Sequence, residues 1–164
     1  MSLNNITKHI ILDVSIDKHV VVLIKQYDID IREILVKITD NGKPYTINSN
    51  IIPRIKCIKP DDKKILNDCT VLSDGTVKIS VTEQMTSCSG MCNCELLLVN
   101  DNTNKVLHTM NFIINVKKSV FSDKEISSTD EFIALENALI KIDNITSGID
   151  IKRITESEID KLFI

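Results

Sequence analysis

The sequence contains no tryptophan, only four glycines and only two alanines among its 164 residues. So few glycines leave no phosphate-binding loop of the GxGxxG or GxxxxGK[ST] type. Aromatic residues make up 4% of the chain, so Tyr27 and Tyr45 are the only loose candidates for stacking on a sugar ring. The net charge of −3 argues against binding of nucleic acid through bulk positive charge.

Long apolar runs are also missing. The longest one near the start, residues 20–24, is far too short to cross a bilayer. Residues 1–5 carry no basic region, and no apolar stretch is followed by a small-residue cleavage site. We therefore expect synthesis in a cytoplasm and no membrane insertion. In such a reducing compartment the five cysteines are expected to be thiols.

Isoleucine, by contrast, occurs 28 times. β-Branched side chains fit a pleated strand and lose rotamer freedom in a helix, so this composition favours strands. Apolar and polar residues alternate in segments 34–38, 77–81 and 110–117, the pattern of strands with one buried face. Turn residues separate such runs, at positions 40–43, 59–62, 73–75 and 100–102. We predict a mainly β fold, an antiparallel β-sandwich of the immunoglobulin-like type.

Both the charge and the hydrophobic period change near Ser119. Residues 1–118 carry 15 basic and 13 acidic groups, whereas residues 119–164 carry 5 basic and 10 acidic groups. The prediction is a β-domain at 1–118, with a short helix or irregular crossover at 82–89. It is followed by a linker and helical segment at 119–164.

The C-terminal segment has the pattern of a helix that needs a partner. Ser128 to Glu131 fits a capping box. Apolar residues then follow at spacings of three, four and three, as in a coiled-coil seam: Phe132, Leu135, Leu139 and Ile142. A helix at about residues 129–144 is marginal alone in water, so we predict that these four side chains form an oligomer interface. The alternative is that the helix folds back on its own β-domain. A second capping box opens a short amphipathic end at residues 155–164.

Three cysteines within seven residues, Cys88, Cys92 and Cys94, suggest a zinc site that Cys57, Cys69 or His108 would complete. The spacing is unlike the paired knuckles of structural zinc sites. Cys92 and Cys94 continue in phase with Leu96 and Leu98, which places both thiols on the buried face of one strand. Core thiols are therefore the preferred interpretation, and no metal is predicted.

Catalytic patterns are equally sparse. His9, His19 and His108 lie in no recognisable nucleophile context. The pairs Asp28/Asp30 and Asp61/Asp62 lack the ligand spacing of a calcium loop, and acidic residues in loops usually form turns. We predict no catalytic residue and no cofactor. Arg54 and Lys56 alternate with apolar residues, as on a solvated strand face.

Residues 34–74 resemble the N-terminal domain of phage baseplate upper proteins, components of siphophage tail tips. The most specific part is the string TDNGKPY at residues 39–45. Lys59-Pro60-Asp61, Asn67-Asp68-Cys69 and the Asp74-Gly75 turn follow it. The likeness continues through Gly90 and Cys94-Glu95-Leu96 to NFIINV at residues 111–116, so it covers about residues 1–118. Asp62 departs from the pattern, because the family commonly has glycine there.

The resemblance implies a structural component of a phage, or prophage-derived, tail baseplate. Its β-domain is then expected to dock onto other tail or baseplate proteins in the virion tail. The helix resembles the linker helix of such proteins and would assemble the chain as a trimer. Residues 119–164 leave room for this helix and little for a receptor-binding head. Two rivals stay open: a carbohydrate-binding, adhesin-like module, and a cysteine-dependent enzyme or zinc protein.

Overall fold

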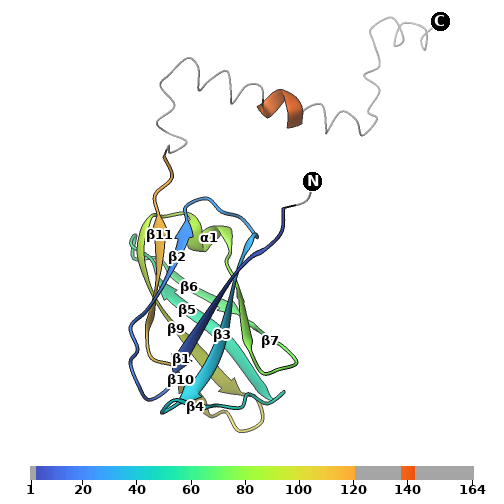
Figure 1. Cartoon of the computed structure of the whole chain (residues 1–164), viewed down its shortest axis with the longest axis vertical. Helices are drawn as coiled ribbons and strands as arrows, with labels where there is room; N and C mark the ends of the chain where they lie inside the picture. The colour runs from blue at the N-terminus through green and yellow to red at the C-terminus, as the bar shows by residue number, and fades with distance from the viewer. Residues whose placement is uncertain (1–2, 121–137, 143–164) are drawn as a thin grey trace, which may run out of the picture. The chain divides into compact units, whose positions relative to one another are not determined.

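The computed structural model describes residues 3–120 and 138–142 of the chain. The chain divides into two units, Met1–Val120 and Phe121–Ile164, and each is described by itself. The described residues of the first unit form β-strands and one short helix (Figure 1). This part of the chain is therefore mainly β, as the isoleucine-rich composition predicts.

Within residues 3–120, one sheet has five strands in the order β1-β3-β8-β7, with β4 paired to the end of β3. Its alternating residues are buried at Ile34, Val36, Val77 and Ile79, so the period-two pattern predicted for these strands is confirmed. The strands are β1 (Ile6–Asp13), β3 (Arg32–Asp40), β4 (Lys43–Pro44), β7 (Thr70–Val71) and β8 (Val77–Ser80).

The other sheet has six strands among the same residues, in the order β2-β11-β9-β5-β6, with β10 paired to β9. Its inward residues include Ile55 on β5, Leu96 on β9 and Phe112 on β11, all at most 1% exposed. The strands are β2 (Val20–Lys25), β5 (Ile51–Ile58), β6 (Lys64–Asp68), β9 (Gly90–Asn100), β10 (Val106–His108) and β11 (Phe112–Lys117).

A single cluster of buried apolar side chains draws on both sheets and forms the core of this unit. The segment predicted as a short helix or crossover contains α1 (Glu83–Thr86), which buries Met85 in this core. The Thr86 hydroxyl donates a hydrogen bond to the carbonyl oxygen of Asp28 at 2.8 Å. The helix thereby links the chain between the two sheets to the loop that follows β2.

All four predicted turn regions contain turns or bends. Asp62 has a positive φ of 60°, as Gly75 does in the next predicted turn at 80°. Left-handed backbone favours glycine, and aspartate tolerates it better than most residues. Asp62 therefore adopts a left-handed geometry that glycine would adopt more readily.

The prediction of a purely antiparallel arrangement is wrong at two places. β1 pairs with β3 in parallel over its whole length, and β11 pairs with β2 in parallel. Because β2 belongs to the other sheet, the chain leaves the first sheet after β1 and returns to it as β3, which runs in the same direction as β1. The alternation of apolar and polar residues indicates which side chains are buried, but it does not indicate which strands pair or in which direction.

Candidate functional site

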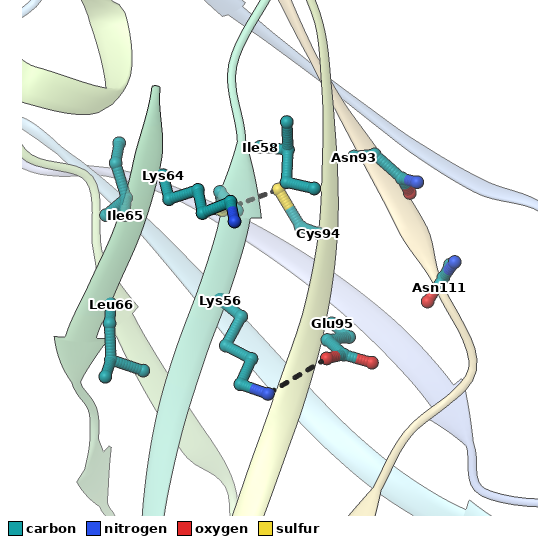
Figure 2. Close-up of a pocket in the computed structure, with 10 residues that line it drawn as sticks. Lys56, Ile58, Lys64, Ile65, Leu66, Asn93, Cys94, Glu95 and Asn111 are labelled. Carbon is teal, nitrogen blue, oxygen red and sulfur yellow. Dashed lines mark hydrogen bonds and ion pairs between the residues drawn. The ribbon is translucent and has the colours of Figure 1, made fainter. Parts of the chain in front are cut away.

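The outward face of the six-stranded sheet carries an open hollow of about 450 Å³, called here the outer groove (Figure 2). Exposed apolar side chains contribute to it, with Ile58 on β5 48% exposed and Leu66 on β6 59% exposed. Large apolar side chains at such exposure are typical of binding surfaces when they gather on one face. The lining consists of Lys56, Cys57, Ile58, Lys64, Ile65, Leu66, Asn93, Cys94, Glu95 and Asn111.

Strand register sets the order of side chains in this groove. Lys56 lies opposite Leu66, and Ile58 lies opposite Lys64, so two lysines and two apolar residues alternate across β5 and β6. On the other side of β5, Lys56 lies opposite Glu95. Residues directly opposite on one face have Cβ atoms about 4.5–5.5 Å apart, and diagonal neighbours are about 7–8 Å apart. The groove therefore has an apolar diagonal with one lysine on either side.

Ion pairs partly neutralise this face. Lys56 Nζ lies 3.5 Å from Glu95 Oε1, and His108 Nδ1 lies 3.1 Å from the same oxygen (Figure 2 draws the Lys56 pair). Arg54 Nε donates to Asp68 Oδ1 at 2.7 Å. The Arg54 and Lys56 side chains on the outward face are 40% and 43% exposed, which confirms the prediction of a solvated strand face there. Partially exposed pairs of this kind contribute little to stability.

A second hollow, of about 390 Å³, shares Lys64 and Ile65 with the outer groove and is called here the lysine pocket. Lys59 is 6% exposed, and its Nζ donates to Ser87 Oγ at 2.8 Å and lies 3.4 Å from Asp61 Oδ2. Burial alone would raise the pKa of Asp61, but hydrogen bonding from Lys63 and the charge of Lys59 lower it. The remaining lining is Lys63, Glu83 and Gln84.

Cys57, Cys92 and Cys94 are buried at 2–3% exposure, which confirms the prediction that they are core thiols. They are free cysteines, and the sulfur atoms of Cys57 and Cys94 are 2.7 Å apart across the paired strands β5 and β9. The hydrogen bond with Cys57, together with burial, raises the pKa of Cys94, and burial raises the pKa of Cys92 to about 11. Protonated thiols are poor nucleophiles and poor metal ligands.

Acidic side chains of the described residues serve local contacts, and with the histidines they form no metal cluster. Among residues 3–120 and 138–142, no three His, Cys, Asp or Glu side chains are placed to hold a metal ion. Asp28 pairs with Arg32, and Asp61 lies near Lys59 and Lys63, so both predicted turn carboxylates serve local ion pairs. In the described part of the chain, no helix is long and apolar enough to span a membrane.

Tyr27 and Tyr45, the two candidates for stacking on a sugar ring, have different environments. Tyr27 is 41% exposed in the loop after β2, with a left-handed φ of 68°. Tyr45 packs partly against the core, and its amide donates to the Ile38 carbonyl at 2.9 Å. Tyr45 also lines a hollow of about 290 Å³ together with Asn100 and Lys105. Of the two tyrosines, Tyr45 is the one beside a described hollow.

Asp13 is the structural residue that sequence reasoning missed. Its carboxylate is 1% exposed and accepts hydrogen bonds from the backbone amides of Ser15, Ile16, Asn41 and Gly42 and from the Thr39 hydroxyl. Burial alone would raise the pKa of Asp13, but these donors outweigh it and hold the pKa well below its usual 3.8. An aspartate at the end of an apolar run, two residues before a serine, is the only signal that the sequence offered.

The predicted oligomer residues fall in the second unit. Residues 138–142 are helical, with Leu139 52% and Ile142 56% exposed. Phe132 and Leu135 lie outside the described residues. The predicted seam is therefore represented by two exposed apolar side chains, spaced three residues apart on one helical segment.

Comparison with known proteins adds to this geometry. The sequence model of the BppU N-terminal domain matches residues 6–144. Among solved structures, the fold is similar to that of the N-terminal domain of phage TP901-1 ORF48, with a TM-score of 0.58 and 15% sequence identity. That match covers 68% of this chain and 98% of the other. The sequence matches none of the curated proteins compared with it.

Proposed function

Because the chain belongs to the BppU N-terminal domain family, a family of phage baseplate domains, we propose that it is a structural component of the tail baseplate. Residues 1–118 form the docking domain, with an immunoglobulin-like sandwich, and residues 119–164 form the linker and oligomerisation helix. The protein is made in the cytoplasm of the bacterial host and acts in the virion tail, without catalysis.

The outward face of the six-stranded sheet is the observation that supports docking. Ile58, Leu66 and Met91 are 48%, 59% and 65% exposed on neighbouring strands, where a one-sided sheet would carry polar side chains. Large exposed apolar side chains that gather on one face among charged groups are typical of a protein-binding site. Other tail or baseplate proteins are the partners in this proposal.

Oligomerisation is assigned to Phe132, Leu135, Leu139 and Ile142. Their spacing forms one stripe on a helix, and helices of this length gain stability by burying such a stripe against copies of themselves. The proposed assembly is a trimer in which three such helices pack around a common symmetry axis. The exposure of Leu139 and Ile142 is compatible with this arrangement.

Light scattering on a sizing column tests the trimer. A trimer of the 18.5 kDa chain has three times that mass. The double substitution Leu135→Asp and Leu139→Asp should reduce the mass to that of one chain, because carboxylates cannot be buried in an apolar seam without large cost. Ile140→Asp places the same charge beside the seam and is the control, which should stay trimeric. A double variant with unchanged mass would refute the seam.

A carbohydrate-binding, adhesin-like role is the second candidate. It is favoured by the hollow beside Tyr45, which combines an aromatic ring with the amide of Asn100 and the ammonium of Lys105. Titration of the protein with soluble fragments of host cell-wall glycan tests it. Saturable binding that is lost in Tyr45→Ala would support this role, and absence of binding would remove it.

A further inference from the structure

The outer groove and the lysine pocket adjoin, and together they are lined by more lysines than carboxylates. Their combined lining holds four lysines, Lys56, Lys59, Lys63 and Lys64, against two carboxylates, Glu83 and Glu95. Asp61, which pairs with Lys59 and Lys63, offsets part of this excess, and residues 1–118 as a whole carry two more basic than acidic groups. An excess of lysines on this surface favours an acidic partner, because complementary potentials steer association and exclude partners of the wrong charge.

Lys64 is the central residue of this region, because it lines both hollows. Among the ion pairs of the described residues, Lys59 and Lys63 share Asp61, and Lys56 pairs with Glu95, whereas Lys64 takes part in none. It lies opposite Ile58 on β5, and its side chain is exposed. A carboxylate from a partner would therefore meet an ammonium group that has no competing intramolecular anion.

The arrangement of side chains narrows the shape of the partner. Ile58 and Leu66 form the apolar diagonal of the groove, with Lys56 on one side of it and Lys64 on the other (Figure 2). Diagonal neighbours on a sheet are about 7–8 Å apart. Two helix residues four positions apart are separated by about 6 Å along the helix axis and form part of one stripe. The residues next to them in the sequence lie on either side of this stripe. An apolar helical stripe bordered by carboxylates on both sides matches this pattern.

We propose that the outer groove, extended by the lysine pocket, binds an acidic amphipathic helix of a partner protein. The inference rests on the proposed docking function and specifies the chemistry of the partner segment. Apolar side chains of that helix contact Ile58 and Leu66, and its carboxylates pair with Lys56 and Lys64. Glu95 and Glu83 would repel a continuous phosphate chain, and no aromatic side chain lines either hollow to stack on a base, so a nucleic acid fits less well.

The test uses the full-length protein and two synthetic helical peptides. Both peptides have two leucines four residues apart, and this pattern repeats every two helical turns. The flanking positions are glutamates in the first peptide and lysines in the second. Fluorescence anisotropy should show saturable binding of the glutamate peptide, weaker at high salt because exposed ion pairs are screened. The lysine peptide should bind at least about tenfold more weakly.

Matched variants locate the site. Lys64→Glu and Leu66→Ser should each weaken binding of the glutamate peptide by about tenfold. Lys37→Glu makes the same charge reversal on an exposed residue of β3, in the other sheet, and should leave binding within about twofold. Circular dichroism on all three variants checks that the fold is retained. Equal binding of both peptides, no binding of the glutamate peptide, or equal loss in Lys37→Glu would overturn the proposal.

Two further outcomes would show that this face binds a different ligand, and they would also overturn the proposal. Preference for a single-stranded oligonucleotide over the glutamate peptide would identify a nucleic-acid surface. Self-association lost in Lys64→Glu would identify a second copy of the chain as the occupant. The seam variant Leu135→Asp/Leu139→Asp separates this inference from the trimer, because it should bind the glutamate peptide as the parent does. A trimer that fails to bind the peptide would refute only the acidic-helix inference.

Discussion

The two faces of the six-stranded sheet come from the same strands but have different surroundings. On β5, Ile55 and Cys57 point into the core and are at most 3% exposed, whereas Ile58 at the end of that strand is 48% exposed in the outer groove. Inward side chains gain stability by leaving water, about 25 cal/mol per Å² of apolar area. Outward apolar side chains gain little from the fold itself. Their value lies in contacts that a partner would complete.

The largest expected effect comes from truncating the inward face. Phe112 on β11 is 1% exposed, and Phe112→Ala should lower the free energy of unfolding by about 3–5 kcal/mol through lost burial and a new cavity. Its neighbour Ile113 points outward and is only partly buried, so Ile113→Ala should cost about 1 kcal/mol or less. Urea unfolding followed by circular dichroism measures both. Equal losses of unfolding free energy in the two variants would show that the inward and outward faces contribute equally to stability.

Asp13 is the last residue of β1, and it is a buried charged group that can be compared with the buried apolar side chains. Asp13→Asn removes the charge that accepts hydrogen bonds from Gly42 and Ser15, and should lower the thermal midpoint by about 5–10 °C at neutral pH. Because the folded pKa is depressed, this stabilisation is present above the unfolded pKa near 3.8 and is lost as pH falls toward the folded pKa.

Midpoints measured between pH 7 and pH 2 check both parts of the Asp13 prediction. The parent should lose stability below about pH 4, and the Asn variant should lose less over the same interval. Asp61 and Asp74 also have lowered pKa values, so part of the acid sensitivity should remain in the variant. Identical pH profiles for parent and variant would show that Asp13 has no such role.

The smallest effect is expected for an ion pair of the outward face. Arg54 and Asp68 have side chains that are 40% and 74% exposed, so Arg54→Ala should change the free energy of unfolding by about 0.2–1 kcal/mol. A double-mutant cycle with Asp68→Ala isolates the pair. A coupling as large as the loss in Phe112→Ala would mean that the outward face contributes to the fold as strongly as the core.

Sequence patterns predicted the inward face well, because burial imposes period two wherever one side of a strand is covered. Ile34, Val77 and Cys94 all lie on the predicted side. The parallel pairing of β1 with β3 was not predictable, because it depends on which sheet β2 joins. Asp13 was missed because three of its five donors, on Thr39, Asn41 and Gly42, lie far along the chain.

The outward groove was hidden for a related reason. Lys56 and Arg54 read correctly as surface residues, but only strand register brings Lys64 and Leu66 of β6 beside Ile58 and Lys56 of β5. Two alternating strands can each look ordinary and still combine into an apolar diagonal bordered by lysines. The sequence therefore predicted the exposure of Arg54 and Lys56, but not which side chains lie beside them across the strands.

The most direct test of the baseplate role is to locate the chain in a particle. Tail particles would be purified from cells that produce this protein, labelled with gold-conjugated antibody against it, and imaged by electron microscopy. The account predicts label concentrated at the tip of the tail, on intact particles. Particles without label, in preparations where the protein remains in the soluble fraction, would contradict the assignment to the baseplate.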